Sequence, residues 1–282
     1  MTIATPPGFV VVNHRDDRWL ADAEIADALG RAHLLEADGV RAALAQADGA
    51  SGRARTALLS IGDARLVLRA VRRGGLLGPW LGGALLTPDR PLREIAVTAA
   101  LRRAGAPVPR PAFGGAFRST GVCSGVTWNG AVATWFEAET RDGETWLRTG
   151  PSQPKLASAL ASAGESVRRL HDAGGSHPDL HVKNLLVREI EEHCEIIVID
   201  LDRARVVPNL GARARMAQLM RLYRSLLKRD LLRIVGERGC AMFFDAYTQQ
   251  DHALRAALLA RLPAERRRIA RHALGYRRFR SS

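Results

Sequence analysis

The sequence has few cysteines and no long hydrophobic run. Its three cysteines stand far apart in 282 residues and form no C-x-x-C pair, so a disulfide framework is not indicated and a reducing cytoplasm is expected. No segment approaches the roughly 20 apolar residues that cross a bilayer. The first twelve residues lack the charged and apolar segments of a secretory signal. Any membrane association is therefore expected to be peripheral.

The sequence also lacks internal repeats, low-complexity tracts and the helix-turn-helix, zinc-finger or RNP-type motifs of nucleic-acid-binding proteins. Acidic residues are few beside the basic ones, 29 Asp and Glu against 42 Lys and Arg, for a net charge of +13. Such an excess favours an anionic partner, either a phosphorylated substrate or an acidic membrane, and no nucleic acid is expected. A solvated basic surface is the alternative interpretation.

One short segment carries the chemistry. Residues 177–184 read H-P-D-L-H-V-K-N, and an apolar run then ends in Asp200, sixteen residues after Asn184. Phosphoryl transfer from ATP needs a carboxylate beside the acceptor hydroxyl and oxygen ligands for Mg²⁺. We therefore expect Asp179 to be the catalytic base, and Asn184 and Asp200 to be the metal ligands. The spacing predicts an α+β, two-lobed protein-kinase-like fold with a β-rich N-lobe and a mainly helical C-lobe.

Three more side chains are candidates for the reaction. Arg69 ends an expected strand and would place a cation on the phosphates, while Glu94, on an expected helix over 91–104, would brace it. An ordinary strand-end arginine and a solvated first-turn glutamate are the alternatives. His181 stands where many kinases carry a lysine, and it either donates a hydrogen bond to the transferred phosphate or is a loop histidine. His177 is expected to orient the loop.

The nucleotide-binding residues are less clearly marked. Residues 49–55 contain two glycines and are the candidate phosphate-covering loop, with Gly52 and Arg53 offering backbone N–H groups. The adenine is expected near Trp135 and Glu137. The polar stretch that follows predicts a boundary between an N-lobe over 1–137, which binds the nucleotide phosphates, and a C-lobe over 138–282, which carries the catalytic loop and binds the acceptor.

Hydrophobic patterning predicts the main elements. Paired strands are expected over 57–61 and 65–69, and a second hairpin within 126–136, turning at Asn129-Gly130. Further expected elements are short helices within 22–29 and 39–47, a helix over 155–173, strands over 185–187 and 196–199, and helices from 212 onward.

Several runs resemble the 3-deoxy-D-manno-octulosonic acid (Kdo) kinases of the bacterial lipopolysaccharide-kinase branch. The octet and the I-D-L-D-R run of 199–203 are similar to the family's motifs, and the R-R-G-G-L run of 72–76 and the R-L-Y-R-S-L-L-K run of 221–228 point to this branch. The resemblance covers about residues 50–230. His181 replaces the family's asparagine, and Ala70-Val71 replaces its His-Tyr.

This resemblance implies ATP-dependent phosphorylation of a Kdo hydroxyl on a lipid A precursor, at the cytoplasmic face of the inner membrane. The apolar segment 72–86 and the C-terminal arginines are then expected to contact the anionic membrane surface. Two alternatives stay open: a small-molecule kinase of the aminoglycoside or choline type, where a histidine often stands at the place of His181, and a non-catalytic kinase-like scaffold. The acceptor hydroxyl, the number of metals and the oligomeric state cannot be read from the sequence.

Overall fold

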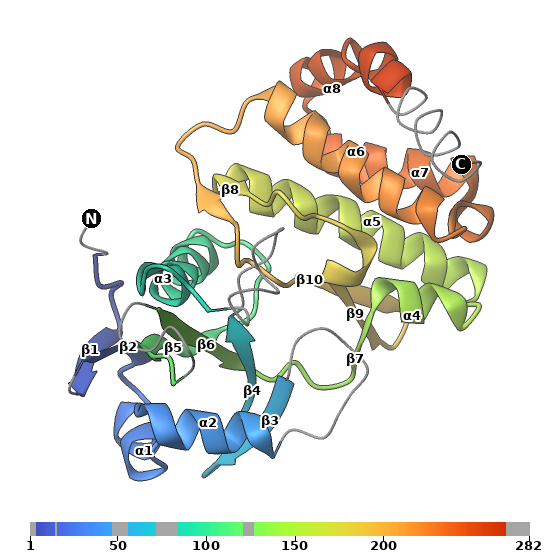
Figure 1. The fold of residues 1–282 in the computed structure, drawn as a ribbon. Coiled ribbons are helices and arrows are strands. Elements are labelled where there is room, and N and C mark those ends of the chain that lie inside the picture. The colour runs from blue at the N-terminus through green and yellow to red at the C-terminus, as the bar shows by residue number, and fades with distance from the viewer. Residues whose placement is uncertain (1–3, 15, 47–55, 72–83, 121–126, 269–282) are drawn as a thin grey trace, which may run out of the picture. The chain divides into compact units, whose positions relative to one another are not determined.

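Residues 4–14, 16–46, 56–71, 84–120 and 127–268 are described by the structure, a computed structural model. The chain divides into unit 1, residues 1–103 and 109–138, and unit 2, residues 104–108 and 139–282 (Figure 1). Gly52 and Arg53 of the expected phosphate loop, residues 72–83 and Cys123 lie outside the described residues.

Unit 1 is built on one antiparallel sheet with the strand order β1-β2-β5-β6-β4-β3. Its strands are β1 (Phe9–His14), β2 (Asp17–Asp22), β3 (Thr56–Ile61), β4 (Ala64–Val71), β5 (Pro111–Arg118) and β6 (Trp128–Trp135). Its helices are α1 (Ala26–Arg31), α2 (Ala37–Ala45) and α3 (Asp89–Arg103). The pairing of β3 with β4 and the helix expected over 91–104 are confirmed.

Helices cover both faces of this sheet. Trp19 of β2 packs with Leu29 of α1 and Val40 of α2 on one face. The next residue, Leu20, points to the other face and packs with Ile95 of α3. Figure 1 shows α2 and α3 on opposite sides of the strands. Because both faces of β2 are buried, its sequence has no polar–apolar alternation, and this strand was not predicted.

The hairpin expected at Asn129-Gly130 is wrong. Residues 128–135 form the single strand β6, in which Gly130 pairs with Ala116 on one side and Val71 on the other. A Cβ at Gly130 would lie 3.0 Å from Cδ1 of Leu85, so the glycine serves close packing instead of a turn. Leu85 itself is buried, which removes it from the segment expected to face a membrane.

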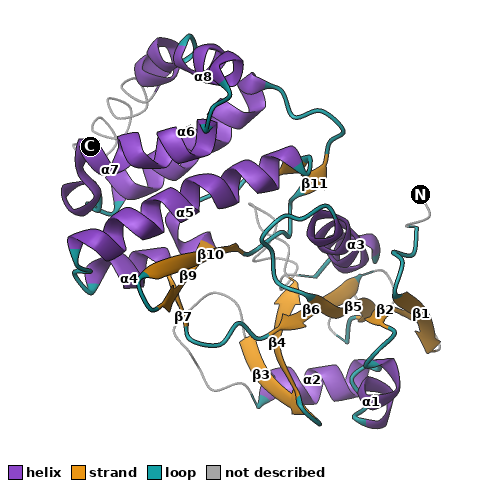
Figure 2. Ribbon diagram, turned by 180° about the vertical axis from the view of Figure 1, so that it is seen from behind, coloured by secondary structure: helices purple, strands orange, loops and turns teal. Residues whose placement is uncertain are grey.

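Unit 2 is mainly helical (Figure 2). Its helices are α4 (Gly143–Arg148), α5 (Gln153–Asp172), the 3₁₀ helix η1 (Val182–Asn184), α6 (Ala212–Lys228), α7 (Leu232–Thr248) and α8 (His252–Leu259). Its strands are β7 (Thr140–Asp142), β8 (Gly175–Ser176), β9 (Leu185–Ile190), β10 (His193–Val198) and β11 (Arg205–Val206). The helix expected over 155–173 and both strands after the octet are confirmed.

The segment after β8 is held in place by its neighbours in unit 2. Asp142 caps α4 by accepting hydrogen bonds from the N–H groups of Glu144 and Thr145, both at 3.1 Å. The first residue of α4, Gly143, approaches this segment so closely that a Cβ there would lie 2.7 Å from the carbonyl oxygen of Val182. The start of α4 therefore supports η1.

Candidate active site

His177 organises the loop that contains Asp179. Its backbone N–H donates to Oε1 of Gln218 (2.7 Å), its Nε2 lies 3.1 Å from the carbonyl oxygen of Ile199, and its Nδ1 lies 3.3 Å from the backbone N of Asp179. Burial lowers the pKa of His177 below its usual value. The Ile199 hydrogen bond and the charges of Asp200 and Asp179 raise this pKa, but by less than burial lowers it. The neutral ring with its proton on Nε2 satisfies both contacts. His177 is thus a structural histidine.

Asn184 ties the two ends of the motif together. Its side-chain Nδ2 donates to the backbone carbonyl of Asp179 (3.0 Å), and its own carbonyl accepts from the N–H of Ile199 (2.9 Å). The amide is buried, and donation by Nδ2 turns its oxygen away from that carbonyl. The two contacts bring Asp179, Asn184 and the residue before Asp200 into one cluster.

Asp200 follows β10 in a left-handed backbone conformation, with a φ of 62°. Ile199 is hydrogen-bonded on both sides, by its N–H to Asn184 and by its carbonyl to His177. These two hydrogen bonds fix the backbone of Ile199, directly before Asp200. A left-handed conformation in a residue other than glycine is strained, and it persists where the surrounding structure enforces it.

The carboxylate of Asp179 is accessible to solvent. Its side chain is 52% exposed, with His181 Nε2 at 3.8 Å from Oδ2 and Arg221 Nη1 at 3.5 Å from Oδ1. The pKa of His181 is lowered, mainly by burial. The charge of Asp179 raises it, that of Arg229 lowers it, and that of Asp200 has a smaller raising effect. A neutral His181 can donate from Nε2. Its Nδ1 is buried with no hydrogen-bond partner among the described atoms.

The donor chemistry of the cluster fits Mg²⁺. Asn184 and Asp200 supply an amide and a carboxylate oxygen, which are hard ligands of the kind this ion prefers. In the described ranges no group of three or more His, Cys, Asp and Glu side chains is placed to hold a metal ion. Two protein ligands suffice for Mg²⁺ at phosphates, because waters and phosphate oxygens complete its octahedron.

Two residues of α6 support the loop and were not predicted. Gln218 is buried and accepts the His177 N–H, and Ser225 Oγ accepts the N–H of Val182 at 2.9 Å while donating to the Leu222 carbonyl at 2.7 Å. Ser225 and Arg221 both lie in the R-L-Y-R-S-L-L-K run. That run was the available signal in the sequence, although it did not say which of its side chains face the loop.

In unit 1, Arg69 of β4 forms an ion pair with Glu94 of α3. The Glu94 side chain is 5% exposed and that of Arg69 is 25% exposed. The carbonyl of Glu94 accepts a hydrogen bond from Thr98 Oγ1 (2.8 Å), which stays within α3. The structure therefore brings the expected cation and the expected brace together, and the phosphate contact of Arg69 stays a prediction.

The expected adenine-binding residues lie at the end of β6 and just beyond it. The Arg110 guanidinium stacks 4.6 Å from the centre of the Trp135 ring and is held by ion pairs to Asp22 and Glu24. The backbone N–H of Trp135 donates a hydrogen bond to the backbone carbonyl of Arg110, so this donor is already used. Glu137 follows at the end of unit 1. Trp135 and Glu137 stay predictions as nucleotide contacts.

Comparison with known proteins identifies the family. The sequence profile of the lipopolysaccharide kinase (Kdo/WaaP) family matches residues 42–247. The chain belongs to this family. A 3-deoxy-D-manno-octulosonic acid kinase of Vibrio parahaemolyticus serotype O3:K6 is 28% identical over 208 residues, or 72% of this chain and 82% of that protein. Its counterpart in Vibrio cholerae serotype O1 is 29% identical over 204 residues, or 70% and 78%.

A solved structure of the family shows the same fold. WaaP in complex with acyl carrier protein matches with a TM-score of 0.51 and 20% identity, over 81% of this chain and 91% of that one. The kinase-like α+β fold is confirmed, and the family membership makes the chain a phosphotransferase that acts on an alcohol group. The prediction of a lipopolysaccharide kinase of the Kdo type is confirmed at the level of the family.

The described helices also bear on membrane association. None of them combines the length and the apolar content needed to cross a bilayer.

Proposed function

We propose that this chain transfers the γ-phosphoryl group of ATP to a hydroxyl of Kdo on a lipid A precursor. The observation that carries the proposal is the hydrogen bond from the Asn184 amide to the Asp179 carbonyl, which joins a base candidate to a metal-ligand candidate. The names of the relatives, which are Kdo kinases, support Kdo as the acceptor.

In this proposal Asp179 orients the acceptor hydroxyl and accepts its proton. The half-exposed carboxylate can contact a substrate from solution. Arg221 Nη1 lies 3.5 Å from one of its oxygens, and His181 Nε2 lies 3.8 Å from the other. General base catalysis by a positioned side chain contributes about 10²- to 10⁴-fold to a rate. His181, kept neutral by burial, is proposed to donate a hydrogen bond to the transferred phosphoryl group.

Asn184 and Asp200 are the residues proposed to hold Mg²⁺. When bound, the ion neutralises charge on the phosphates and orients them for in-line transfer. The buried amide of Asn184 and the enforced backbone of Asp200 support this role, because a ligand held in advance loses little freedom on binding.

Unit 1 is proposed to bind the nucleotide. Arg69, braced by Glu94, is the proposed cation for the phosphates, and a guanidinium can fork onto two phosphate oxygens at once. Backbone N–H groups of Gly52 and Arg53 are proposed to cover the phosphates, and Trp135 and Glu137 to contact the adenine. This assigns nucleotide binding to residues 1–137, and catalysis and acceptor binding to residues 138–282.

We place the reaction at the cytoplasmic face of the inner membrane, with the chain bound peripherally. The acceptor is a lipid, and the net charge of +13 favours an anionic membrane surface. Arg266, Arg267 and Arg268 are described in the structure and add basic charge near the C-terminus.

The test is mass spectrometry of a Kdo-bearing lipid A precursor after incubation with the protein, ATP and Mg²⁺. One phosphate is expected on the Kdo, and Asp179→Asn is expected to reduce its formation by about 10²- to 10⁴-fold. Asp230→Asn is the matched control, since this exposed carboxylate pairs with Arg233 on the surface of unit 2.

Other outcomes would replace the proposal. Phosphorylation of soluble aminoglycosides or choline, with the lipid left unmodified, would indicate a small-molecule kinase. Failure to bind ATP with or without Mg²⁺ would indicate a scaffold without catalysis. Full transfer by the Asp179→Asn variant would remove Asp179 from the mechanism.

A further inference from the structure

Lys183 lies in η1, directly before the proposed metal ligand Asn184, and has no role in the proposed mechanism. Its side chain is 52% exposed, and its Nζ lies 3.6 Å from Oε2 of Glu144 on α4. This distance is too long for a hydrogen bond, and among the described residues the Lys183 ammonium makes none. Its three N–H donors are therefore available to a ligand beside the catalytic loop.

Glu144 already has two closer partners. Arg148 Nη2 lies 2.9 Å from Oε1, and Arg229 Nε lies 2.7 Å from Oε2. Backbone carbonyls also hold these arginines, since Arg148 donates to that of Arg229 at 3.0 Å and Arg229 donates to that of Ser225 at 3.3 Å. Burial raises the pKa of Glu144, but the two arginine hydrogen bonds and the charge of Lys183 lower it by more. Each oxygen of the ionised Glu144 thus pairs with an arginine, and Lys183 is a surplus cation.

Lys183, Arg148, Arg229 and Glu144, here called the cation cluster, carry an excess of positive charge. Three cations share one carboxylate, and the neighbouring acid, Asp142, uses its side chain to cap α4. The Arg148 side chain is 46% exposed and that of Lys183 is 52% exposed, so a ligand can reach both. Because guanidinium and ammonium groups bind oxyanions strongly, the cation cluster favours a carboxylate or phosphate.

The cation cluster lies close to the proposed base, with His181 between them. Burial lowers the pKa of His181, the Asp179 charge raises it and the Arg229 charge lowers it, so both charged groups stand near the ring. Nε2 of His181 lies 3.8 Å from Oδ2 of Asp179. A substrate whose hydroxyl contacts Asp179 therefore has positive charge beside it, on the side of His181.

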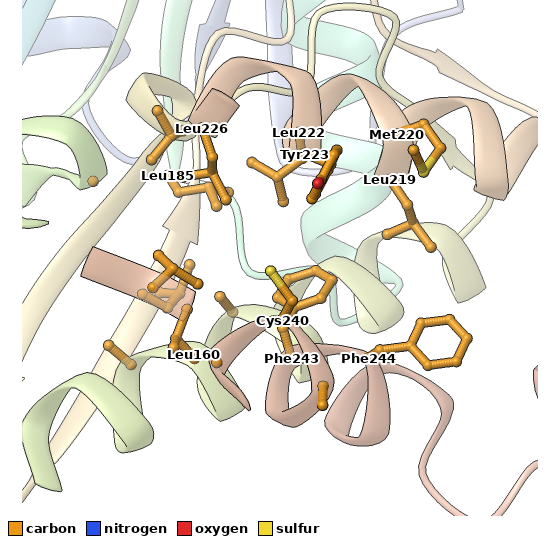
Figure 3. Close-up of a pocket in the computed structure, with 18 of the residues that line it drawn as sticks. Leu160, Leu185, Leu219, Met220, Leu222, Tyr223, Leu226, Cys240, Phe243 and Phe244 are labelled. Carbon is orange, nitrogen blue, oxygen red and sulfur yellow. The ribbon is translucent and has the colours of Figure 1, made fainter. Parts of the chain in front are cut away.

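A different face of α6 borders an apolar cavity of about 480 Å³ in unit 2. Figure 3 shows Leu222 and Tyr223 of α6 pointing toward Cys240 and Phe243 of α7 across this cavity. Among the described residues that line it, Arg266 alone carries a charge. The polar groups of a sugar would find few partners there, so the cation cluster is the better place for a charged part of the acceptor.

The proposed acceptor is a sugar acid. Its carboxyl group is ionised at neutral pH and is carried on the same short carbon skeleton as the hydroxyls. When one of those hydroxyls contacts Asp179, two carboxylates lie near each other, and a cation has to offset their repulsion. Lys183 can turn toward the acid group, because its ammonium sits on a flexible stem and Glu144 keeps both arginines.

We propose that Lys183 binds the carboxylate of the sugar-acid acceptor, with Arg148 and Arg229 supplying the surrounding positive charge. The identity of the acceptor rests on the proposed function, and the inference adds the residue that makes the site selective for an acid. The same charge disfavours cationic acceptors such as aminoglycosides and choline.

The first test compares the Kdo-bearing lipid A precursor with the same lipid whose Kdo carboxyl group is converted to an uncharged carboxamide. The parent protein is expected to have a KM about tenfold lower for the acid, the value of one charge-assisted contact. Lys183→Gln should raise KM for the acid by about tenfold and leave KM for the carboxamide and for ATP unchanged. Lys183→Arg should keep the preference for the acid.

The matched control is Lys155→Gln, which removes another ion pair between a lysine and a glutamate of unit 2, that of Lys155 with Glu189. It should leave the KM values for both acceptors as they are in the parent protein. Equal KM values of the parent protein for the acid and the carboxamide would overturn the proposal. A rise in KM for ATP in Lys183→Gln, with acceptor KM unchanged, would overturn it too, because Lys183 would then contact the nucleotide.

The second test separates the carboxylate from phosphate groups of the lipid, which present similar oxygen atoms. An acceptor treated with a phosphatase, so that its lipid phosphates are removed, should show the same loss of affinity in Lys183→Gln. If the loss disappears with the phosphates and persists in the carboxamide, Lys183 binds phosphate and the assignment to the carboxylate is overturned.

The third test needs no catalysis. Free Kdo, without lipid or ATP, is expected to give a saturation-transfer NMR signal with the parent protein and with Lys155→Gln, and a much weaker signal with Lys183→Gln. Equal signals in the three proteins would overturn the proposal. Binding through Lys183 without phosphate transfer to any Kdo-lipid would reject the proposed function and leave a sugar-acid site. Transfer to the Kdo-lipid with a KM that Lys183→Gln does not change would reject this inference alone.

Discussion

Nη1 of Arg221 on α6 lies 3.5 Å from Oδ1 of Asp179. The two side chains are 47% and 52% exposed, so the ion pair adds at most about 1 kcal/mol to stability. The ion pair instead orients the Asp179 carboxylate, because Nε2 of His181 lies 3.8 Å from the other carboxylate oxygen. The proposed base is thus flanked on both sides before any substrate binds.

Replacing Arg221 should therefore affect turnover more than folding. Arg221→Gln is expected to lower kcat/KM on the order of tenfold, about 1.4 kcal/mol of transition-state stabilisation, because the carboxylate loses the contact that orients it. Arg221→Lys should recover part of the loss. The measurements are steady-state kinetics and urea unfolding. Arg233→Gln breaks an exposed ion pair with Asp230 at 3.1 Å and is the control. Equal losses in both Gln variants would contradict an orienting role.

The hydrogen bond from Val182 to Ser225 should matter for catalysis as well as stability. Ser225→Ala leaves the buried N–H of Val182 without its acceptor, at a cost of about 1–3 kcal/mol in the free energy of unfolding. Ser158→Ala is the matched control, since Ser158 Oγ accepts the Cys194 N–H at 3.0 Å, away from the loop. Similar stability losses are expected, with a lower kcat in Ser225→Ala only. A kcat that falls equally in both would argue for a general effect of instability.

The ion pair between Arg69 and Glu94 predicts non-additive losses. Glu94→Leu removes the carboxylate that pairs with Arg69, and Arg69→Met removes the guanidinium that pairs with the buried Glu94, so each is expected to cost about 3 kcal/mol of unfolding free energy. The double variant should cost less than the sum of the two, because each single variant already loses the same ion pair. Urea unfolding of the three variants measures this coupling, and strict additivity would show that the pair contributes nothing.

Arg69→Lys tests the proposed phosphate contact separately. A lysine keeps the charge next to Glu94 but loses the forked geometry of a guanidinium. Stability should stay within about 1 kcal/mol, while KM for ATP rises. An unchanged KM for ATP in this variant and in Arg69→Met would remove Arg69 from nucleotide binding.

Stability should fall in mild acid through His171. Burial lowers the pKa of this histidine to about 3, against 6.5 for an unperturbed one. Between these values the unfolded chain binds a proton that the folded chain does not, so stability falls as the pH falls from 6.5 toward 3. The slope is about 1.4 kcal/mol per pH unit. The pKa of His177 is lowered by burial in the same direction and adds to the effect.

His171→Asn should flatten this acid limb. An asparagine can replace Nδ1 in the hydrogen bond to the Tyr247 hydroxyl (2.7 Å) without taking up a proton. The measurement is the free energy of unfolding from pH 4 to pH 7. His193→Asn, at an exposed position of β10, should keep the slope of the parent protein. An unchanged slope in His171→Asn would show that His171 does not carry the effect.

The sequence was informative where chemistry is encoded over a short distance. The spacing of Asp179, Asn184 and Asp200 indicated the kinase-like fold, and 2.0- and 3.6-residue periodicity predicted β3, β4, α3 and α5 to within a few residues. Asn129-Gly130 misled because a glycine in a strand and a glycine in a turn look alike until the packed neighbour is known. That neighbour, Leu85, lies 45 positions earlier in the sequence.

By itself, then, the sequence determined the family, the fold class and the residue types of the motif, since all of these are written in local spacing and pattern. Only the tertiary structure decided that Gln218 and Ser225 hold the loop, across 41 and 43 residues of chain. It alone also decided that the faces of α6 and α7 leave a cavity between them. Contacts across such distances depend on how whole elements pack, and side-chain packing leaves no regular trace along the chain.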